Sequence, residues 1–411
     1  MEAKEFLVER HGYIKTLEKY LDKPLIKVLT GMRRSGKSSL MRILIRKLLE
    51  KGVPSGNIVY VNKESLEFDA IEDYRDLNRF VKDAFKKARG NKYIFIDEIQ
   101  EIASWEKAVS SLMAEKTGDV FISGSNAHLL SSELATLISG RYVEVIVRPL
   151  SFGEYLEFRK ESQTRDLDEE LRLYLKYGGL PGIHFLSFDD ETIFGYLNSI
   201  LNTVLFKDVI AKNSIRDVSA LERIVKYLMD NIGNVTTAKR IADYFKAQRI
   251  TISTDTVLNY IRYLENGFLV KKANRYDLKG RKVMEFYDKI FLSDIGLRNG
   301  MLGFKESDIG GILENLVYNE LLFRGYRVFI GVLGGLEVDF VAEKQNERLY
   351  CQVCSVLSAG KTAEREFGNL EKIHDNYKKI VISMNKFFGP GRKGIEHKYL
   401  VDFLLESRHP A

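Results

Sequence analysis

The sequence of 411 residues contains only two cysteines, Cys351 and Cys354. So few thiols argue against a disulfide framework. Their C-x-x-C spacing is compatible on paper with zinc or redox chemistry, but a structural zinc site needs about four ligands and no second cysteine or histidine pair stands nearby. We therefore expect both cysteines to be ordinary strand residues.

Long apolar runs are also absent, and none approaches the ~18 residues that a membrane span requires. The first residues, Met1 to Glu5, lack the charged-then-apolar pattern of a signal peptide. We therefore predict a cytoplasmic protein that does not enter a membrane. The net charge is +6 and the isoelectric point is about 8.9. This excess is compatible with nucleic-acid binding without requiring it.

Apolar residues make up 45% of the chain and charged residues 29%, as in ordinary globular domains. A chain of this length is expected to form two or three domains.

A complete G-x-x-x-x-G-K-S motif runs from Gly31 to Ser38. It lies between an apolar stretch at 25–29 that predicts a strand and an apolar-periodic stretch at 40–48 that predicts a helix. Such a loop binds nucleotide phosphates through its backbone N–H groups and the positive helix N-terminus. We expect Lys37 to reach the β- and γ-phosphates and Ser38 to ligate Mg²⁺. The predicted nucleotide-binding residues are Gly31, Arg33, Arg34, Ser35, Gly36, Lys37, Ser38 and Ser39.

A second signal of a phosphate site is an apolar strand at 93–96 that ends in Asp97 and Glu98. Ligands of open parallel sheets bind at the carboxyl ends of the strands, where both acids would lie. Asp97 can then hold the Mg²⁺ shell, and Glu98 can orient or deprotonate the attacking water. Beside the loop motif, a merely solvated strand end is the weaker interpretation.

A third strand, at 120–123, leads into Ser125 and Asn126. Small polar groups at this place can hydrogen-bond the γ-phosphate or the lytic water, although Asn126 fits equally well as the N-cap of a helix at 128–138.

Arg141 then follows that helix and opens a strand at 143–147. In a ring-shaped ATPase such an arginine can reach a neighbour's γ-phosphate. Taken alone, it is more simply a surface arginine or a helix C-terminal cap.

Residues 1–200 resemble the AAA-type ATPase domain of a large prokaryotic family that joins a P-loop domain to a C-terminal domain of uncharacterised type. The matching stretches are 29–40, 94–100, 122–130, 139–142 and 149–155. The resemblance implies a RecA/AAA-like sheet, Mg²⁺-dependent ATP hydrolysis and assembly into homo-oligomeric rings, for example hexamers. It also favours Arg141 as a trans-acting arginine, and it makes Arg33 and Arg34 part of the family pattern.

Residues 151–211 are mainly helical by pattern and are interrupted by a Gly/Pro cluster at 177–182, which marks a hinge or loop. We expect a small helical lid here.

Apolar periodicities at 221–232, 241–245 and 257–264 then predict three short helices. Strands follow at 268–270 and 283–291. Three helices followed by a β-hairpin resemble a winged helix-turn-helix.

Basic residues outnumber acidic ones across this winged-helix segment. On a DNA-binding topology such an excess predicts phosphate contacts, which position a protein on DNA without reading bases. The alternative is a winged helix that only packs against the ATPase or a partner. The predicted DNA-contacting residues are Lys239, Arg240, Arg249, Lys271, Lys272, Arg275, Lys279, Arg281 and Lys282.

The last hundred residues predict a helix at 314–322, three strands at 327–330, 336–341 and 349–353, a helix at 362–377 and a strand at 379–383. This order resembles the PD-(D/E)xK nuclease fold seen at the C-terminus of the same ATPase family. In that fold acidic residues and a lysine bind metal and activate water. The resemblance implies that Glu314 and Asp339 occupy the first two acidic positions.

The third position of that motif departs from the pattern. Gln352 and Cys354 lie on one face of their strand, where a carboxylate and a lysine are expected. A neutral amide is a poor ligand for Mg²⁺, and a thiol cannot replace a fixed positive charge. Lys361 on the neighbouring loop is a candidate to supply the missing positive charge. We therefore predict a degenerate site with little or no nuclease activity.

These patterns together predict an α/β protein with four parts. They are an AAA/RecA-like P-loop core with a parallel sheet (1–150), a helical lid and linker (151–211), a winged helix (212–305) and a restriction-endonuclease-like α/β domain (306–411). The leading hypothesis is a Mg²⁺-dependent ATPase that acts on branched or duplex DNA. A nucleotide-controlled switch or scaffold that binds a protein partner is the alternative, and an ATP-coupled nuclease is disfavoured by Gln352 and Cys354.

Overall fold

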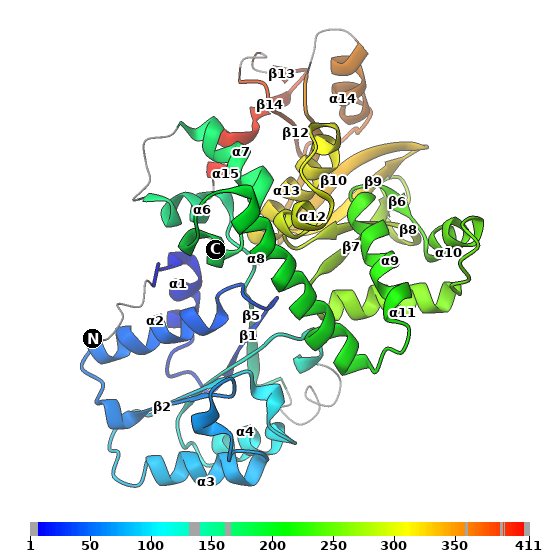
Figure 1. Ribbon diagram of the computed structural model, residues 1–411. Helices are drawn as coiled ribbons and strands as arrows, with labels where there is room; N and C mark the ends of the chain where they lie inside the picture. The colour runs from blue at the N-terminus through cyan, green and yellow to red at the C-terminus, as the bar shows by residue number, and fades with distance from the viewer. Residues whose placement is uncertain are drawn as a thin grey trace. The chain divides into compact units, whose positions relative to one another are not determined.

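The computed structural model describes residues 7–130, 140–160, 166–357, 361–386, 389 and 391–406. The chain divides into two compact units (Figure 1). The first consists of the residues up to 148 together with 266–268, and the second of residues 149–265 and the chain from 269 onward. Of the helices within the described ranges, none combines the length and the apolar character needed to cross a bilayer.

The first unit contains a five-stranded parallel sheet with the order β2-β3-β4-β1-β5. Its strands are β1 (Ile26–Thr30), β2 (Ile58–Asn62), β3 (Tyr93–Asp97), β4 (Asp119–Gly124) and β5 (Tyr142–Ile146). Every residue of β1 and β3 is buried, as expected of continuous apolar strands covered on both faces. The predicted α/β fold with a parallel P-loop sheet is therefore confirmed.

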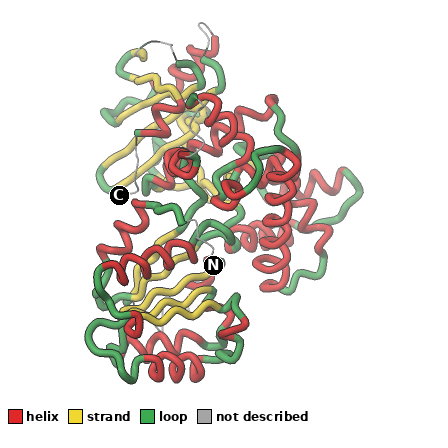
Figure 2. The backbone as a smooth tube through the Cα atoms, turned by 60° about the vertical axis from the view of Figure 1, so that its left-hand side comes forward, coloured by secondary structure: helices red, strands yellow, loops and turns green. Residues whose placement is uncertain are grey.

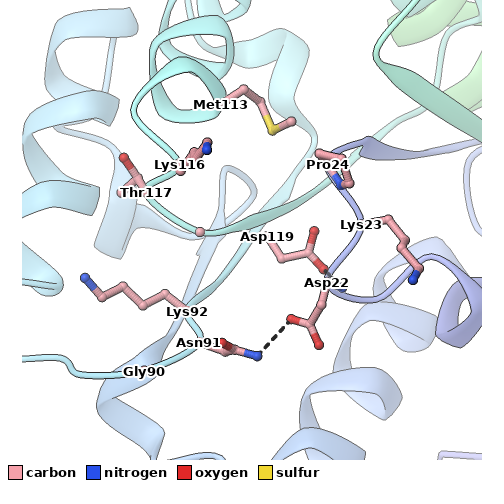
Figure 3. Close-up of a pocket in the computed structure, with 11 residues that line it drawn as sticks. Asp22, Lys23, Pro24, Gly90, Asn91, Lys92, Met113, Lys116, Thr117 and Asp119 are labelled. Atoms are coloured by element: carbon pink, nitrogen blue, oxygen red, sulfur yellow. Dashed lines mark hydrogen bonds between the residues drawn. The ribbon is translucent and has the colours of Figure 1, made fainter.

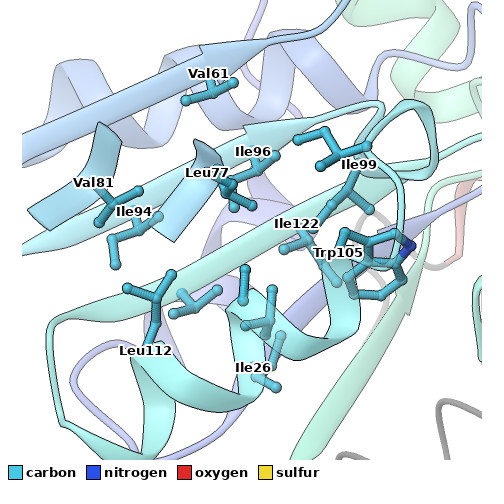
Figure 4. Close-up of a cluster of buried hydrophobic side chains, with 14 of the residues drawn as sticks. Ile26, Val61, Leu77, Val81, Ile94, Ile96, Ile99, Trp105, Leu112 and Ile122 are labelled. Carbon is cyan, nitrogen blue, oxygen red and sulfur yellow. The ribbon is translucent and has the colours of Figure 1, made fainter. Parts of the chain in front are cut away.

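Helices cover both faces of this sheet, as Figure 2 shows. They are α1 (His11–Lys19), α2 (Lys37–Glu50), α3 (Tyr74–Ala84) and α4 (Trp105–Ala114). Beneath α3 and α4 lies an apolar core that includes Leu77, Ile94, Leu112 and Ile122, all fully buried (Figure 4). Each such side chain contributes about 1.5–3 kcal/mol by leaving water. Of the helix predicted at 128–138, residues 131–139 lie outside the described ranges, and the part before them is a 3₁₀ turn, Ala127–Leu130.

The second unit begins with the helical segment that the sequence predicts as a lid. It comprises α6 (Phe152–Phe158), α7 (Leu167–Tyr177) and α8 (Asp190–Thr203), and α8 continues as a π-helix, Val204–Ala211. The Gly/Pro cluster forms a loop that is tightly held. Gly179 N–H donates to Asp294 Oδ2 at 2.7 Å, and a Cβ on Gly178 would lie 2.3 Å from Asp294 Oδ1. A Cβ on Gly179 would lie 2.4 Å from the carbonyl oxygen of Leu150, so neither glycine of this pair has room for a side chain.

Three helices and a hairpin follow in the predicted order. They are α9 (Val218–Asp230), α10 (Ala238–Ala247), α11 (Thr254–Asn266), β7 (Val270–Asp277) and β8 (Lys282–Leu292). The short strand β6 (Val235–Thr236) pairs with β8. Thr237 caps α10 by accepting the backbone N–H of Arg240, which is the capping role that threonine favours.

The remaining elements continue the same unit. They are α12 (Ile295–Leu302), α13 (Ile309–Phe323), β9 (Arg327–Leu333), β10 (Leu336–Lys344), β11 (Glu347–Cys354), α14 (Lys361–Glu371), β12 (Lys378–Ser383), β13 (Gly391–Arg392), β14 (Ile395–Tyr399) and α15 (Leu400–Leu405). Cys351 and Cys354 are free, buried residues of β11, as the sequence predicts.

One mixed sheet of nine strands connects the hairpin to the C-terminal strands, in the order β13-β14-β12-β11-β10-β9-β7-β8-β6. The junction is a parallel pairing of β7 with β9, in which Tyr276 faces Gly331. The expected division near residue 305 therefore falls inside one compact unit and one continuous sheet. Pairing between strands so far apart in sequence leaves no local signal, whereas the hairpin itself does.

Candidate functional site

The loop between β1 and α2 lies at the carboxyl edge of the five-stranded sheet. Gly31 and Gly36 have φ values of 140° and 101°, which favour glycine. A Cβ on Gly31 would lie 2.2 Å from the carbonyl oxygen of Val147, so this position also lacks space for a side chain. Because α2 begins at Lys37, its first backbone N–H groups face the loop, where they favour an anion.

Lys37 is buried, and its ammonium is turned onto the loop that carries it. Nζ donates to the carbonyl oxygens of Gly31 at 2.8 Å and Met32 at 3.1 Å. Both acceptors are neutral backbone oxygens, so these two contacts hold the ammonium against the loop without neutralising it. The loop also contains two arginines. Arg33 pairs with Glu64 at 2.9 Å, and Arg34 is exposed with a positive φ.

Arg10 supports the loop from outside the motif. Its buried guanidinium donates to the backbone oxygens of Ser35 at 3.1 Å and Arg148 at 2.8 Å, and it lies over the ring of Tyr13. Arg10 therefore ties the loop to the chain segment after β5. Sequence reasoning missed this residue because it stands 25 positions from Ser35 and belongs to no motif.

Asp97 ends β3 and is almost fully buried. Its carboxylate accepts hydrogen bonds from Ser123 Oγ and from Tyr60 OH, the latter at 3.1 Å. Burial, together with the Asp97 charge, raises the pKa of Tyr60 to about 12, so that the hydroxyl stays protonated and donates. Ser123 Oγ also accepts the backbone N–H of Glu98 at 3.2 Å. The sequence offers only one weak signal for these partners, a serine at the end of an apolar strand.

Glu98 is buried and adopts a left-handed backbone conformation with φ of 53°. Such a conformation costs a non-glycine residue about 1–3 kcal/mol and tends to occur at functional sites. Its carboxylate accepts a hydrogen bond from the side-chain amide of Gln100. Gln100 Oε1 is buried and has no hydrogen-bond partner among the described residues. Gln100 is therefore a further site residue that sequence reasoning missed.

Ser125 and Asn126 follow β4 directly, and both are buried. In the sheet order β4 lies between β3 and β1. Because the carboxyl ends of parallel strands share one edge, the structure brings the loop, Asp97, Glu98, Ser125 and Asn126 to the same edge of the sheet.

Arg141 lies at the other edge of the sheet. It is exposed, and its carbonyl oxygen accepts the N–H of Ile26, the first residue of β1, at 2.9 Å. The phosphate loop follows the last residue of β1, so the structure does not bring Arg141 to the loop of its own chain. A role for Arg141 in the site of a neighbouring subunit stays a prediction.

The same amino edge contains a cavity of about 370 Å³ (Figure 3). Asp119, one of the residues that line the cavity, forms a buried ion pair with Lys27. Asn91 contacts Asp22 at 3.3 Å across the opening. Since the cavity lies at the end of the strands opposite the phosphate loop, it is not part of the nucleotide site.

The predicted DNA-contacting residues lie on α10, on the turn after it, and on the β7–β8 hairpin. Seven of the nine are exposed: Lys239, Arg240, Arg249, Lys271, Lys279, Arg281 and Lys282. Lys272 is half-buried beside Glu265. Arg275 is also half-buried, and its Nε has no hydrogen-bond partner among the described residues.

The predicted degenerate nuclease residues come together in the second unit. Asp339 lies on β10, where its backbone N–H donates to Gln352 Oε1 at 3.4 Å and its Oδ2 accepts the N–H of Val353 at 2.8 Å. Cys354 is buried farther along β11, and Glu314 lies on α13.

A lysine that the sequence prediction did not include, Lys289 on β8, joins this cluster. Its Nζ lies 2.9 Å from Glu314 Oε2 and 2.8 Å from Glu337 Oε1. The side chain of Lys361, the substitute considered from the sequence, lies outside what the structure describes. Across the described residues, no group of three or more His, Cys, Asp or Glu side chains is arranged to hold a metal ion.

Comparison with known proteins adds an independent view of both units. Residues 23–156 match the model of an AAA domain, and residues 168–308 match a domain of unknown function (DUF8612). An uncharacterized protein of Haemophilus influenzae is 37% identical over 401 residues, covering 97% of this chain and 99% of its own length. An uncharacterized protein of Methanocaldococcus jannaschii is 31% identical over 360 residues, covering 84% of this chain and 78% of its own.

Among solved structures, the Walker-type ATPase of Pyrococcus abyssi is similar with a TM-score of 0.48 and 14% identity, covering 72% of this chain and 97% of that one. The Aeropyrum pernix Orc1 protein, solved in complex with DNA, has a TM-score of 0.33 and 15% identity over 71% of this chain and 92% of its own. Both similarities are weak.

Proposed function

The chain belongs to a prokaryotic family that joins an AAA-type P-loop ATPase domain to a second domain, and from this premise we propose that it hydrolyses ATP to ADP and phosphate in a reaction coupled to DNA. The observation that supports the reaction best is the shared sheet edge. There the glycine loop with Lys37 meets the buried pair of Asp97 and Ser123 and the strained Glu98.

Each residue at this edge has a role in the proposed reaction. The loop N–H groups hold the phosphates, and Lys37 leaves its carbonyl partners for the β- and γ-phosphate oxygens. Ser38 and Asp97 are the residues that would hold Mg²⁺, which neutralises the charge on those oxygens when it is bound with the nucleotide. Glu98 orients the lytic water and accepts its proton.

We assign Ser125 and Asn126 the role of hydrogen-bonding the γ-phosphate or the water. The strand-end position of both residues, buried beside Ser123, supports this role.

We propose that the active form is a homo-oligomeric ring, for example a hexamer. The position of Arg141 supports this, because an exposed arginine remote from its own phosphate loop fits a role in a neighbour's site. In mixed oligomers, Arg141→Ala subunits would then lower the turnover of adjacent wild-type subunits.

The proposed DNA substrate is branched or duplex. Seven exposed basic side chains lie on α10, on the turn after it and on the β7–β8 hairpin, within a segment whose elements follow the order of a winged helix, and they support binding through phosphates. The C-terminal strands would extend this surface as a nuclease-like module that does not cut, since Gln352 and Cys354 stand in its site.

One observation favours a second candidate, a nucleotide-dependent switch that binds a protein partner. The side-chain amide of Gln100 donates a hydrogen bond to the carboxylate of Glu98. While the carboxylate is engaged in this way it cannot activate water, so ATP hydrolysis is slow until Gln100 releases it. Such a switch predicts tight nucleotide retention and a partner that binds in one nucleotide state only.

The deciding experiment measures steady-state ATPase rates with Mg²⁺, alone and with single-stranded, duplex and four-way-junction DNA, at low and moderate salt. Stimulation by one DNA form supports a DNA-coupled ATPase. Hydrolysis that is indifferent to every DNA, together with no DNA binding at low salt, rejects the coupling and supports the switch. Lys37→Ala is the control for contaminating ATPases.

A further inference from the structure

Lys289 is a buried cation in the second unit, remote in sequence from the residues that surround it. It lies on β8, a strand fixed on both sides by pairing with β6 and β7. Its ammonium contacts Glu314 from α13 and Glu337 from β10, at 2.9 and 2.8 Å. Three elements therefore meet at one nitrogen atom.

Two more acids belong to the same cluster. Asp339 is buried on β10, and burial together with repulsion from Glu314 raises its pKa well above the ordinary value. Glu366 on α14 is 1% exposed, its charge acts on both Asp339 and Glu314, and its Oε2 has no hydrogen-bond partner within the described residues. Arg365, which is exposed, pairs with the other oxygen of Glu366.

The electrostatic balance keeps Lys289 charged. Burial alone would lower the pKa of Lys289, but Glu314, Asp339 and Glu337 more than offset burial and raise the pKa above its ordinary value. A charged lysine in this place is the compensation that buried carboxylates require.

We propose that the Lys289 ammonium is the resident cation of this acid cluster, in the place that a divalent metal would otherwise take. Its contacts are hydrogen bonds of 2.8 and 2.9 Å, whereas Mg²⁺ needs oxygen ligands at about 2.1 Å. A metal would therefore have to displace Lys289 and draw the carboxylates inward. The second unit is then a metal-independent module, whether or not the first unit hydrolyses ATP.

The test uses the full-length, nucleotide-free protein, Mn²⁺ as the probe, and calorimetry and thermal unfolding as readouts. Wild type and Asp339→Asn should bind the same amount of Mn²⁺, because the acid cluster of the wild type holds none. Lys289→Met should lower Tm in chelator by roughly 10 °C and should gain a Mn²⁺ site that restores part of this loss. Lys378→Met is the matched control, because Lys378 forms an ion pair at 3.0 Å with Glu396 that is half exposed on the same sheet. Its Tm should change little.

Two results would overturn the proposal. One is a Mn²⁺ site in wild type that Asp339→Asn abolishes. The other is a Lys289→Met protein that neither loses stability nor gains Mn²⁺. If Lys289→Met does not fold, the triple variant that adds Glu314→Gln and Glu337→Gln decides. It should fold in chelator if Lys289 serves to balance these charges, and its failure to fold would count against that role.

Discussion

Lys37 in the first unit and Lys289 in the second are both buried, and they differ in what their ammonium groups face. Lys37 donates to two neutral carbonyl oxygens of its own loop, and these contacts hold its ammonium in place without neutralising it. Lys289 donates to two carboxylates, and its charge is spent on neutralising them. A buried cation with neutral partners is available to an incoming anion, whereas one with acidic partners stabilises the fold. The acceptor, more than the lysine, indicates which function a buried ammonium has.

Substitution of Lys37 tests this contrast most strongly. Lys37→Ala should weaken nucleotide binding and lower ATP turnover by roughly 10³-fold, because the cation nearest the transferred phosphate is lost. Its Tm should move by only a few degrees, because the two hydrogen bonds that are lost have neutral carbonyl acceptors and no buried carboxylate is left unpaired by their loss. Lys289→Met should show the opposite, a lower Tm with unchanged nucleotide affinity. Nucleotide titration and thermal unfolding of both variants check the pair. A Lys37→Ala protein with normal turnover would show that the loop is not the site.

Glu98 separates binding from chemistry within the first unit. Glu98→Gln should lower turnover by roughly 10²-fold while ATP still binds, because only the group that activates water has changed. Single-turnover hydrolysis and nucleotide affinity, measured on the same preparation, distinguish the two effects. Normal hydrolysis by this variant would refute the role assigned to Glu98. Glu101→Gln serves as the control, because Glu101 is exposed and ends the short 3₁₀ turn, Ile99–Glu101, that follows Glu98.

The smallest effect concerns pH and the second unit. Both ring nitrogens of His184 are buried without a hydrogen-bond partner among the described residues, and burial, with the Arg159 charge, lowers its pKa to about 3. The unfolded chain therefore binds a proton at higher pH than the folded chain does. The contribution of His184 to the free energy of unfolding is fully present above about pH 6.5 and is lost as the pH falls toward 3. At pH 5 the loss is about 2 kcal/mol.

His184→Phe should remove this acid sensitivity, and the exposed His374→Phe should not. Denaturant unfolding at pH 8 and pH 5 provides the comparison. Burial acts on Asp294 in the opposite direction, since it raises the pKa of that carboxyl to about 6. The difference between His184→Phe and wild type isolates the histidine from that opposing contribution. If His184→Phe and wild type lose the same free energy of unfolding between pH 8 and pH 5, the acid sensitivity does not come from His184.

The sequence predicts those parts of the site that are contiguous along the chain. The loop from Gly31 to Ser38, and the acids Asp97 and Glu98, each lie in a short motif whose chemistry depends on spacing. Four of the five strands of the first unit, and the helices and strands predicted between residues 221 and 383, follow from apolar patterns in the same way. The prediction did not include β2, α12, β14 or α15.

Partners that only folding brings together were not predictable in this way. Tyr60, Ser123 and Arg10 reach the site from separate strands or from the N-terminal segment, and no periodicity marks them. In the sequence Lys289 is one more basic residue of the hairpin region, yet its side chain is directed toward buried acids. Its role depends on the parallel pairing of β7 with β9, which is a contact between distant parts of the chain.

That pairing also governs how the chain can be cut. A fragment that ends near residue 305 would lose β9 and leave the backbone N–H and C=O groups of β7, from Arg275 to Asp277, exposed along an open edge. Exposed strand edges of this kind recruit other strands and promote aggregation. A truncation intended to isolate the three helices and the hairpin would therefore behave worse in solution than one that retains the C-terminal strands.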